Sequence, residues 1–177
     1  TFFRFFQKFK EDPEKQNTVY FTSMTSVFIV SVLFLFFGIM ARQPLADAFK
    51  HSDEVNFLIW FLFILAADAM SAVPFAKLRI QNKSMYFASL KIMNSIVMFI
   101  LTIILIFWIP GQITNNGWGA EFFSKIYNFN YGIGYAFAAN LIASIVTFLA
   151  LIPTMLKGKF SFDPSLWEKM LVYAWPI

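Results

Sequence analysis

Two charged residues stand inside long apolar runs and are the groups best suited to chemistry. Asp68 lies in the run FILAADAMSAVPFAKLR, and Lys91 lies in the run after the next short link. A bare charge in the middle of a membrane costs several kcal/mol, so such residues are usually paired, hydrated or functional. They could bind a charged solute or carry a proton, or they could form a structural ion pair. Lys91 could also extend its ammonium group to the membrane surface.

Four apolar stretches are long enough to hold these charges within a membrane. A membrane helix needs about 20 mainly apolar residues. The sequence predicts spans at 19–40, 55–76, 85–109 and 131–156. Asp68 and Lys91 then lie at similar depth on adjacent antiparallel helices. We predict that they pair, directly or through water, in the cytoplasmic half of a polar cavity.

Composition supports an all-α polytopic membrane helix bundle. Hydrophobic residues make up 59% of the chain and charged residues 14%, whereas soluble domains carry about 25% charged residues. The mean hydropathy is +0.64. The absence of cysteine excludes thiol catalysis and cysteine metal sites, and nothing predicts a cofactor or a metal. The net charge of +4 resides mainly between the apolar runs, so no nucleic-acid partner is expected.

Lys and Arg residues predict the orientation of the spans. Leaving out Lys91, ten of them fall on one side and three on the other, which places both chain ends in the cytoplasm. Trp and Tyr residues cluster near the predicted outer boundary: Trp60, Trp108, Trp118, Tyr127 and Tyr131. Four prolines fall near span ends, where a missing amide donor costs least: Pro44, Pro74, Pro110 and Pro153.

These assignments divide the chain into three parts. Residues 1–18 are expected to be the cytoplasmic end of a preceding helix and a link, and residues 19–156 form the four-helix part. Residues 157–177 are expected to form a cytoplasmic amphipathic helix that leads into a further span, with Asp163 as N-cap and Pro164 at its first position. We therefore expect the chain to be an internal segment of a longer membrane protein.

Polar residues also recur at helical spacing within two spans. Asn94 shares the helix face of Lys91. Asn140, Ser144 and Thr147 form a stripe on the fourth span. Small and hydroxyl residues commonly let membrane helices approach one another, so helix packing is the favoured interpretation of this stripe. Asn140 could instead line a cavity.

Three segments carry a resemblance to a transporter family. They are TFFRFF at the start, LRIQNKSMYFASLKIMN in the middle and FDPSLWEKMLVYAWPI at the end. In order and spacing they resemble bacterial polysaccharide biosynthesis proteins, the Wzx-type oligosaccharide flippases of the multidrug/oligosaccharidyl-lipid/polysaccharide exporter superfamily. The resemblance implies that these spans are helices three to six of a twelve- to fourteen-helix transporter with two lobes.

The resemblance also implies a function. It predicts a non-enzymatic flippase that moves undecaprenyl-diphosphate-linked oligosaccharides across the bacterial inner membrane for polysaccharide or O-antigen (lipopolysaccharide) synthesis by alternating access. Expected partners are the lipid-linked substrate, membrane lipids, a coupling ion or proton, and neighbouring polymerase and glycosyltransferase enzymes. Basic side chains suit a diphosphate. The substrate-cavity candidates are Arg4, Asp68, Arg79, Lys91, Asn94 and Asn140.

Three other functions stay open at this point. A drug or cation exporter of the same superfamily would need an acidic cavity, whereas the candidates are mostly basic. A membrane-embedded glycosyl- or acyltransferase or polymerase would need paired acids or His–Asp chemistry, which these connecting segments do not supply. A structural membrane scaffold would have little use for intramembrane charges.

Overall fold

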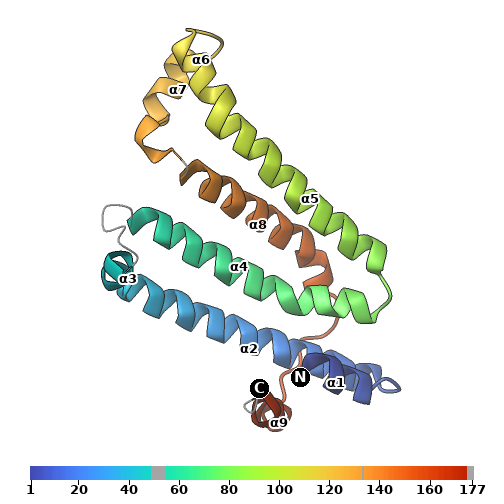
Figure 1. Ribbon diagram of the computed structural model, residues 1–177. Helices are drawn as coiled ribbons and strands as arrows, with labels where there is room; N and C mark the ends of the chain where they lie inside the picture. The colour runs from blue at the N-terminus through green and yellow to red at the C-terminus, as the bar shows by residue number, and fades with distance from the viewer. Residues whose placement is uncertain (49–54, 133, 175–177) are drawn as a thin grey trace.

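The computed structural model describes residues 1–48, 55–132 and 134–174 of the chain, and in these ranges the secondary structure is helical (Figure 1). The long helices are α2 (Pro13–Met40), α4 (Val55–Ile80), α5 (Ser84–Ile103) and α8 (Gly134–Met155). The short helices are α1 (Phe2–Lys8), α3 (Arg42–Ala48), α6 (Ile109–Thr114), α7 (Ala120–Ile126) and α9 (Pro164–Ala174). A π-turn, η2 (Ile104–Trp108), joins α5 to α6, and a 3-10 turn, η3 (Phe129–Tyr131), precedes α8.

Within the described residues, four helical segments are long and apolar enough to cross a membrane. They are Pro13–Met40, Phe57–Ile80, Ser84–Thr114 and Gly134–Met155. Each overlaps one predicted span, which confirms the all-α membrane helix bundle. The chain is therefore a multi-pass membrane protein.

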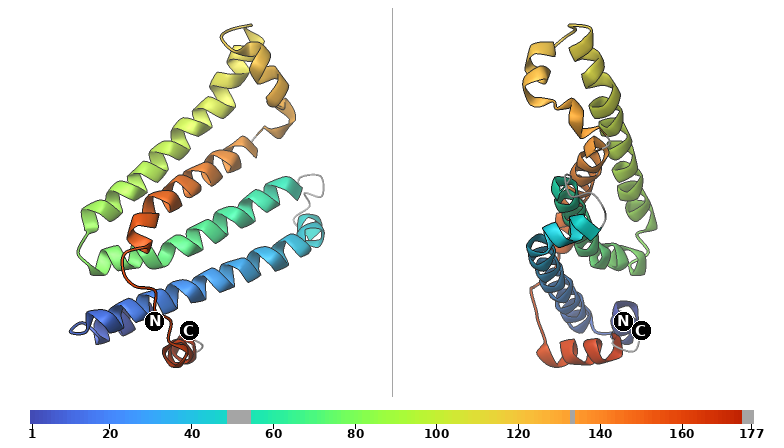
Figure 2. Two further views of the ribbon diagram at one scale, coloured as in Figure 1. Left: turned by 180° about the vertical axis from the view of Figure 1, so that it is seen from behind. Right: turned by 60° about the vertical axis from the view of Figure 1, so that its left-hand side comes forward.

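The long helices lie side by side in an order that differs from their order in the chain. Helix α8 packs against both α4 and α5, and α2 packs against the other side of α4. The resulting order is α2, α4, α8, α5 (Figures 1 and 2). Helices α4 and α5 diverge from their short link, and α8 occupies the space between them. The start of the chain and α9 lie at the end of the bundle that contains this link (Figures 1 and 2).

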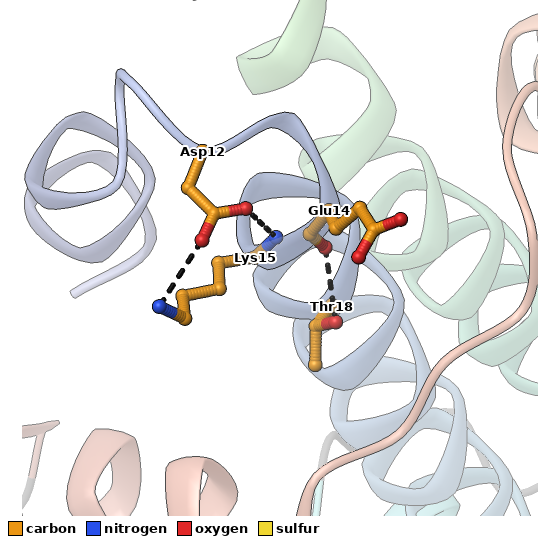
Figure 3. A network of polar contacts seen from close by, with 4 residues as sticks. All are labelled: Asp12, Glu14, Lys15 and Thr18. Carbon is orange, nitrogen blue, oxygen red and sulfur yellow. Dashed lines mark hydrogen bonds and ion pairs between the residues drawn. The ribbon is translucent and has the colours of Figure 1, made fainter.

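Helix α2 begins earlier than predicted because its polar first turn is well capped. The carboxylate of Asp12 accepts a hydrogen bond from the Lys15 amide at 3.0 Å and pairs with the Lys15 ammonium at 3.1 Å (Figure 3). The Lys15 amide is the main cause that lowers the pKa of Asp12. Pro13 occupies the first turn, where its missing amide costs nothing. The helix then continues to Met40.

Prolines have different effects in two of the spans. Pro110 cannot donate to the carbonyl four residues earlier, and the chain just before it forms the π-turn η2, in which the Ile109 amide bonds to the Ile104 carbonyl. Pro74 was expected near the end of a span, but α4 continues past it to Ile80. Pro74 is fully buried, so packing on neighbouring helices compensates for its missing amide.

Two clusters of buried side chains lie at the end of the bundle that holds α1 and α9. One cluster of buried side chains joins α2, α4 and α9 and includes Tyr20, Val73 and Met170. Another joins α4, α5 and α8 and includes Leu78 and Leu151, which are 1% and 0% exposed. Through these two clusters, α4 is packed against each of the other three spans at this end.

Helix α9 begins at Pro164 with Asp163 as its N-cap, as predicted for the C-terminal helix. The Asp163 carboxylate accepts hydrogen bonds from the amides of Ser165 and Leu166 at 2.9 and 3.2 Å, as expected for an N-cap. Leu166 and Met170 are buried in the cluster with α2. The predicted continuation into a further span concerns residues 175–177, which lie outside the described residues.

Candidate functional site

The centre of the bundle contains a polar strip on α8 that contacts both neighbouring helices. The Ser144 hydroxyl donates a hydrogen bond to Asp68 on α4 at 3.3 Å. On the other side, the Asn94 amide of α5 donates to the Thr147 hydroxyl at 2.8 Å. Thr147 in turn donates to the Ala143 carbonyl at 2.9 Å. One strip of one helix therefore provides partners for polar groups on two others.

The burial of this strip confirms the packing interpretation of the stripe on the fourth span. Ser144 and Thr147 are each 3% exposed, and Ala139 and Ala143 are fully buried. Small side chains here allow α8 to fit between α4 and α5. Asn140, one turn before Ser144, is half-buried. Its predicted role in lining a cavity stays a prediction.

The direct form of the predicted pairing between Asp68 and Lys91 is wrong, whereas pairing through water stays a prediction. Asp68 bonds to Ser144, and the Lys91 ammonium lies 4.7 Å from the centre of the Phe75 ring. Among the described residues, one ion pair has its nitrogen and oxygen atoms within 4 Å, and it joins Lys15 to Asp12. The physical reason is the helix order, because α8 separates the midpoints of α4 and α5. Equal depth on consecutive helices did not imply contact.

Asp68 and Lys91 both lie on the exposed surface of this chain. Asp68 is near the middle of α4, where hydrocarbon against a bare carboxylate would cost several kcal/mol. This face of α4 therefore requires water or additional protein beside it. Lys91 is closer to the start of α5, and a cation over an aromatic ring is favourable in a partly desolvated position.

The remaining candidates do not converge with Asp68 in this chain. The Arg4 guanidinium lies 4.4 Å from the centre of the Tyr173 ring, in the contact between α1 and α9. The Arg79 guanidinium lies 4.3 Å from the centre of the Phe87 ring, near the link from α4 to α5. The structure thus separates a central polar strip from basic groups at one end.

Lys77 is a buried cation that the sequence analysis missed. It is 7% exposed, its ammonium lies 3.6 Å from the centre of the Tyr20 ring, and it donates to the Lys157 carbonyl at 3.3 Å. The prediction ended the span at 76 and treated Lys77 as part of a solvated link. Its spacing of four residues from the apolar Val73 was the available signal, because it places both on one helix face.

Aromatic residues gather at the opposite end of the bundle. The rings of Trp60 and Tyr131 lie 6.2 Å apart between centres, and Tyr127 stacks on Tyr135 at 4.4 Å. Burial, and then the neighbouring Tyr135, raise the pKa of Tyr127. Such amphipathic rings are typical of a membrane–water boundary. Two boundaries of the bundle are thus chemically distinct, one aromatic and one basic.

Comparisons with known proteins reach only part of the chain. No model of a known protein family matches it, and no solved structure matches it. A stretch of 68 residues, 38% of the chain, is 29% identical to the chitin synthase csm1 of Pyricularia grisea and equally to chitin synthase 6 of Pyricularia oryzae. The match spans 4% of the length of each of these proteins.

Proposed function

We propose that this chain is part of a membrane transporter that moves a lipid-linked, diphosphate-bearing oligosaccharide across the bacterial inner membrane. The observation that carries the proposal is Asp68, an exposed carboxylate near the middle of a spanning helix, held by a buried hydroxyl of α8. A scaffold has little use for such a group, whereas a transporter needs a polar surface at this depth.

The charge distribution favours an anionic solute over a cationic drug. Arg79, Lys77 and Lys83 lie near the link between α4 and α5, the end of the bundle predicted to face the cytoplasm. Phosphate groups are bound well by such basic side chains. In this proposal the diphosphate enters at the basic end, and the face of α4 with Asp68 lines the route through the membrane.

Asp68 is also the proposed site of coupling to a proton or ion. A carboxylate with one hydroxyl partner and access to water can exchange a proton during a transport cycle. Asp68→Asn keeps the size of the side chain and an oxygen that can accept the hydrogen bond from Ser144, but it removes the negative charge. We expect the variant to lose at least about tenfold in transport rate, and its rate to lose its dependence on a proton gradient.

The test uses proteoliposomes that contain the protein as its gene encodes it and a labelled undecaprenyl-diphosphate oligosaccharide. Flipping is measured as accessibility of the label to an added enzyme that modifies the sugar. Lys125→Met, which removes an exposed charge on α7 at the opposite end, is the control. Equal flipping by the parent protein and by empty vesicles would contradict the transporter proposal. Full, gradient-dependent activity of Asp68→Asn would contradict only the coupling role.

The partial match to chitin synthases favours a second function, the membrane part of a polysaccharide-forming glycosyltransferase. In that case the spans would hold the growing polymer and the chemistry would require an additional catalytic unit. Incubation of the purified protein with radiolabelled sugar nucleotides separates the two. Incorporation into polymer without flipping supports the glycosyltransferase, and flipping without incorporation supports the transporter.

A further inference from the structure

A second polar region lies at the basic end of the bundle, away from Asp68. A cavity of about 480 Å³ opens there between the starts of α2 and α5 and the ends of α4 and α8. Three lysines line it: Lys77, Lys83 and Lys157. Among the described residues, no aspartate or glutamate lines this cavity.

Lys77 is the reason to regard this cavity as a binding site. Its side chain is more than nine-tenths buried, and its contacts are the Tyr20 ring and the Lys157 carbonyl. A ring face and a carbonyl dipole offset part of the cost of burying an ammonium group, but neither supplies a full negative charge. Buried charges in proteins are normally paired with an opposite charge. Lys77 is therefore poised for an anion from outside the chain.

Tyr20 provides an independent observation in the same place. It lines the cavity and is fully buried, and its hydroxyl has no hydrogen-bond partner among the described residues. A buried hydroxyl without a partner costs about 1–3 kcal/mol. Together the site offers a buried ammonium, two exposed ammonium groups and a free hydroxyl. This set of donors, without an acceptor charge, suits a phosphate group.

We propose that this cavity binds the phosphate of an anionic lipid headgroup. The cavity is lined by residues at the ends of all four spanning helices, so it lies at the level of the headgroups. A free phosphate or diphosphate ion offers the same chemistry, and the experiment separates the two sources. The proposal holds whether the protein transports or polymerises, because it depends on Lys77 and the cavity alone.

The test measures the thermal stability of the purified protein in a neutral detergent during titration with short-chain phosphatidic acid. Phosphatidylcholine of the same chain length and inorganic diphosphate are titrated in parallel. A ligand that binds the folded state raises the unfolding temperature with its concentration. We expect phosphatidic acid to stabilise the parent protein and phosphatidylcholine to have little effect. Stabilisation by diphosphate alone would support phosphate recognition but assign it to a free ion.

Lys77→Met is the decisive variant. We expect it to weaken phosphatidic acid binding by at least about tenfold, the effect of losing one hydrogen bond to a charged group. Without lipid it should be as stable as the parent or more so, because it removes a buried, unpaired charge. Lys77→Arg should retain binding. Lys10→Met, at the same end but outside the cavity, is the matched control.

Three results would overturn the proposal. They are no stabilisation by either anion, equal stabilisation of the parent protein and Lys77→Met, and an equal loss in Lys10→Met. If Lys77→Met does not fold, the double variant Lys83→Met and Lys157→Met gives the same test, because both side chains are exposed. Unchanged affinity in that double variant would also contradict the site.

Discussion

Helices α4 and α5 are consecutive in the chain and similarly apolar, yet they are packed very differently. A third of the most apolar stretch of the α4 span is buried within the chain, whereas none of that of the span Ser84–Thr114, which begins with α5, is buried. Helix α4 lies between α2 and α8, and α5 contacts α8 on one side only. The difference teaches that hydropathy identifies a span but not its neighbours, because lipid and helix are equally apolar surroundings.

The largest effect should come from trimming a fully buried side chain of α4. Leu78→Ala should destabilise the protein by about 2 kcal/mol, the low end for such changes, because packing rather than transfer from water is lost in a membrane. Ile96→Ala on α5, where Ile96 is 51% exposed, should change stability by less than about 0.5 kcal/mol. Unfolding in mixed SDS micelles measures both. Equal losses would remove the contrast between the two helices.

Two glycines offer a second comparison. A Cβ atom at Gly134 would clash with the Phe57 ring, whereas one at Gly111 would meet no neighbouring atom within 4 Å. Gly134→Ala should therefore cost about 1 kcal/mol as the Phe57 ring shifts. Gly111→Ala in α6 should be neutral or stabilising, since alanine favours the helix. The same micelle assay applies, and a stable Gly134→Ala would show that α4 and α8 are less closely packed here.

The contact of α5 with α8 can be measured directly. A double-mutant cycle on Asn94→Ala and Thr147→Val should give a coupling energy of about 0.6 kcal/mol, the average for hydrogen bonds between membrane helices. The cycle on Asn94→Ala and Ser144→Ala should give a value near zero, because Ser144 bonds to α4 instead. If the larger coupling energy were instead found between Asn94 and Ser144, Ser144 rather than Thr147 would be the residue of α8 that contacts α5.

The smallest effect concerns the cap of α9. The hydrogen bond from the Ser165 hydroxyl, followed by that from the Leu166 amide, lowers the pKa of Asp163 below its usual 3.8. Because the pKa of Asp163 is lower in the folded protein, the ionised cap stabilises α9 fully above pH 3.8. This stabilisation is lost as the pH falls through the lower pKa of the folded state. Protection of α9 amides from hydrogen exchange should decrease over that window, and Asp163→Asn should remove the dependence. Protection that rises on acidification would contradict the cap.

Much of the fold followed from the sequence because each span is a continuous apolar run between charged links. All four spans and the cap at Asp163 were predicted from such local signals. The partner of Asp68 was not, since Ser144 is distant in the chain and nothing local indicates that α8 lies between α4 and α5. Lys77 was missed for a related reason. A lysine just past an apolar run looks solvated until the packing of α2 and α8 around it is known.

The position of α8 also has a consequence for biosynthesis. The chain is made from its N-terminal end, so Asp68 and Asn94 are synthesised before their partners Ser144 and Thr147 on α8. The nascent hairpin must keep its two arms apart, or reopen, to admit the last span. A chain truncated before residue 134 would leave both polar groups without these partners.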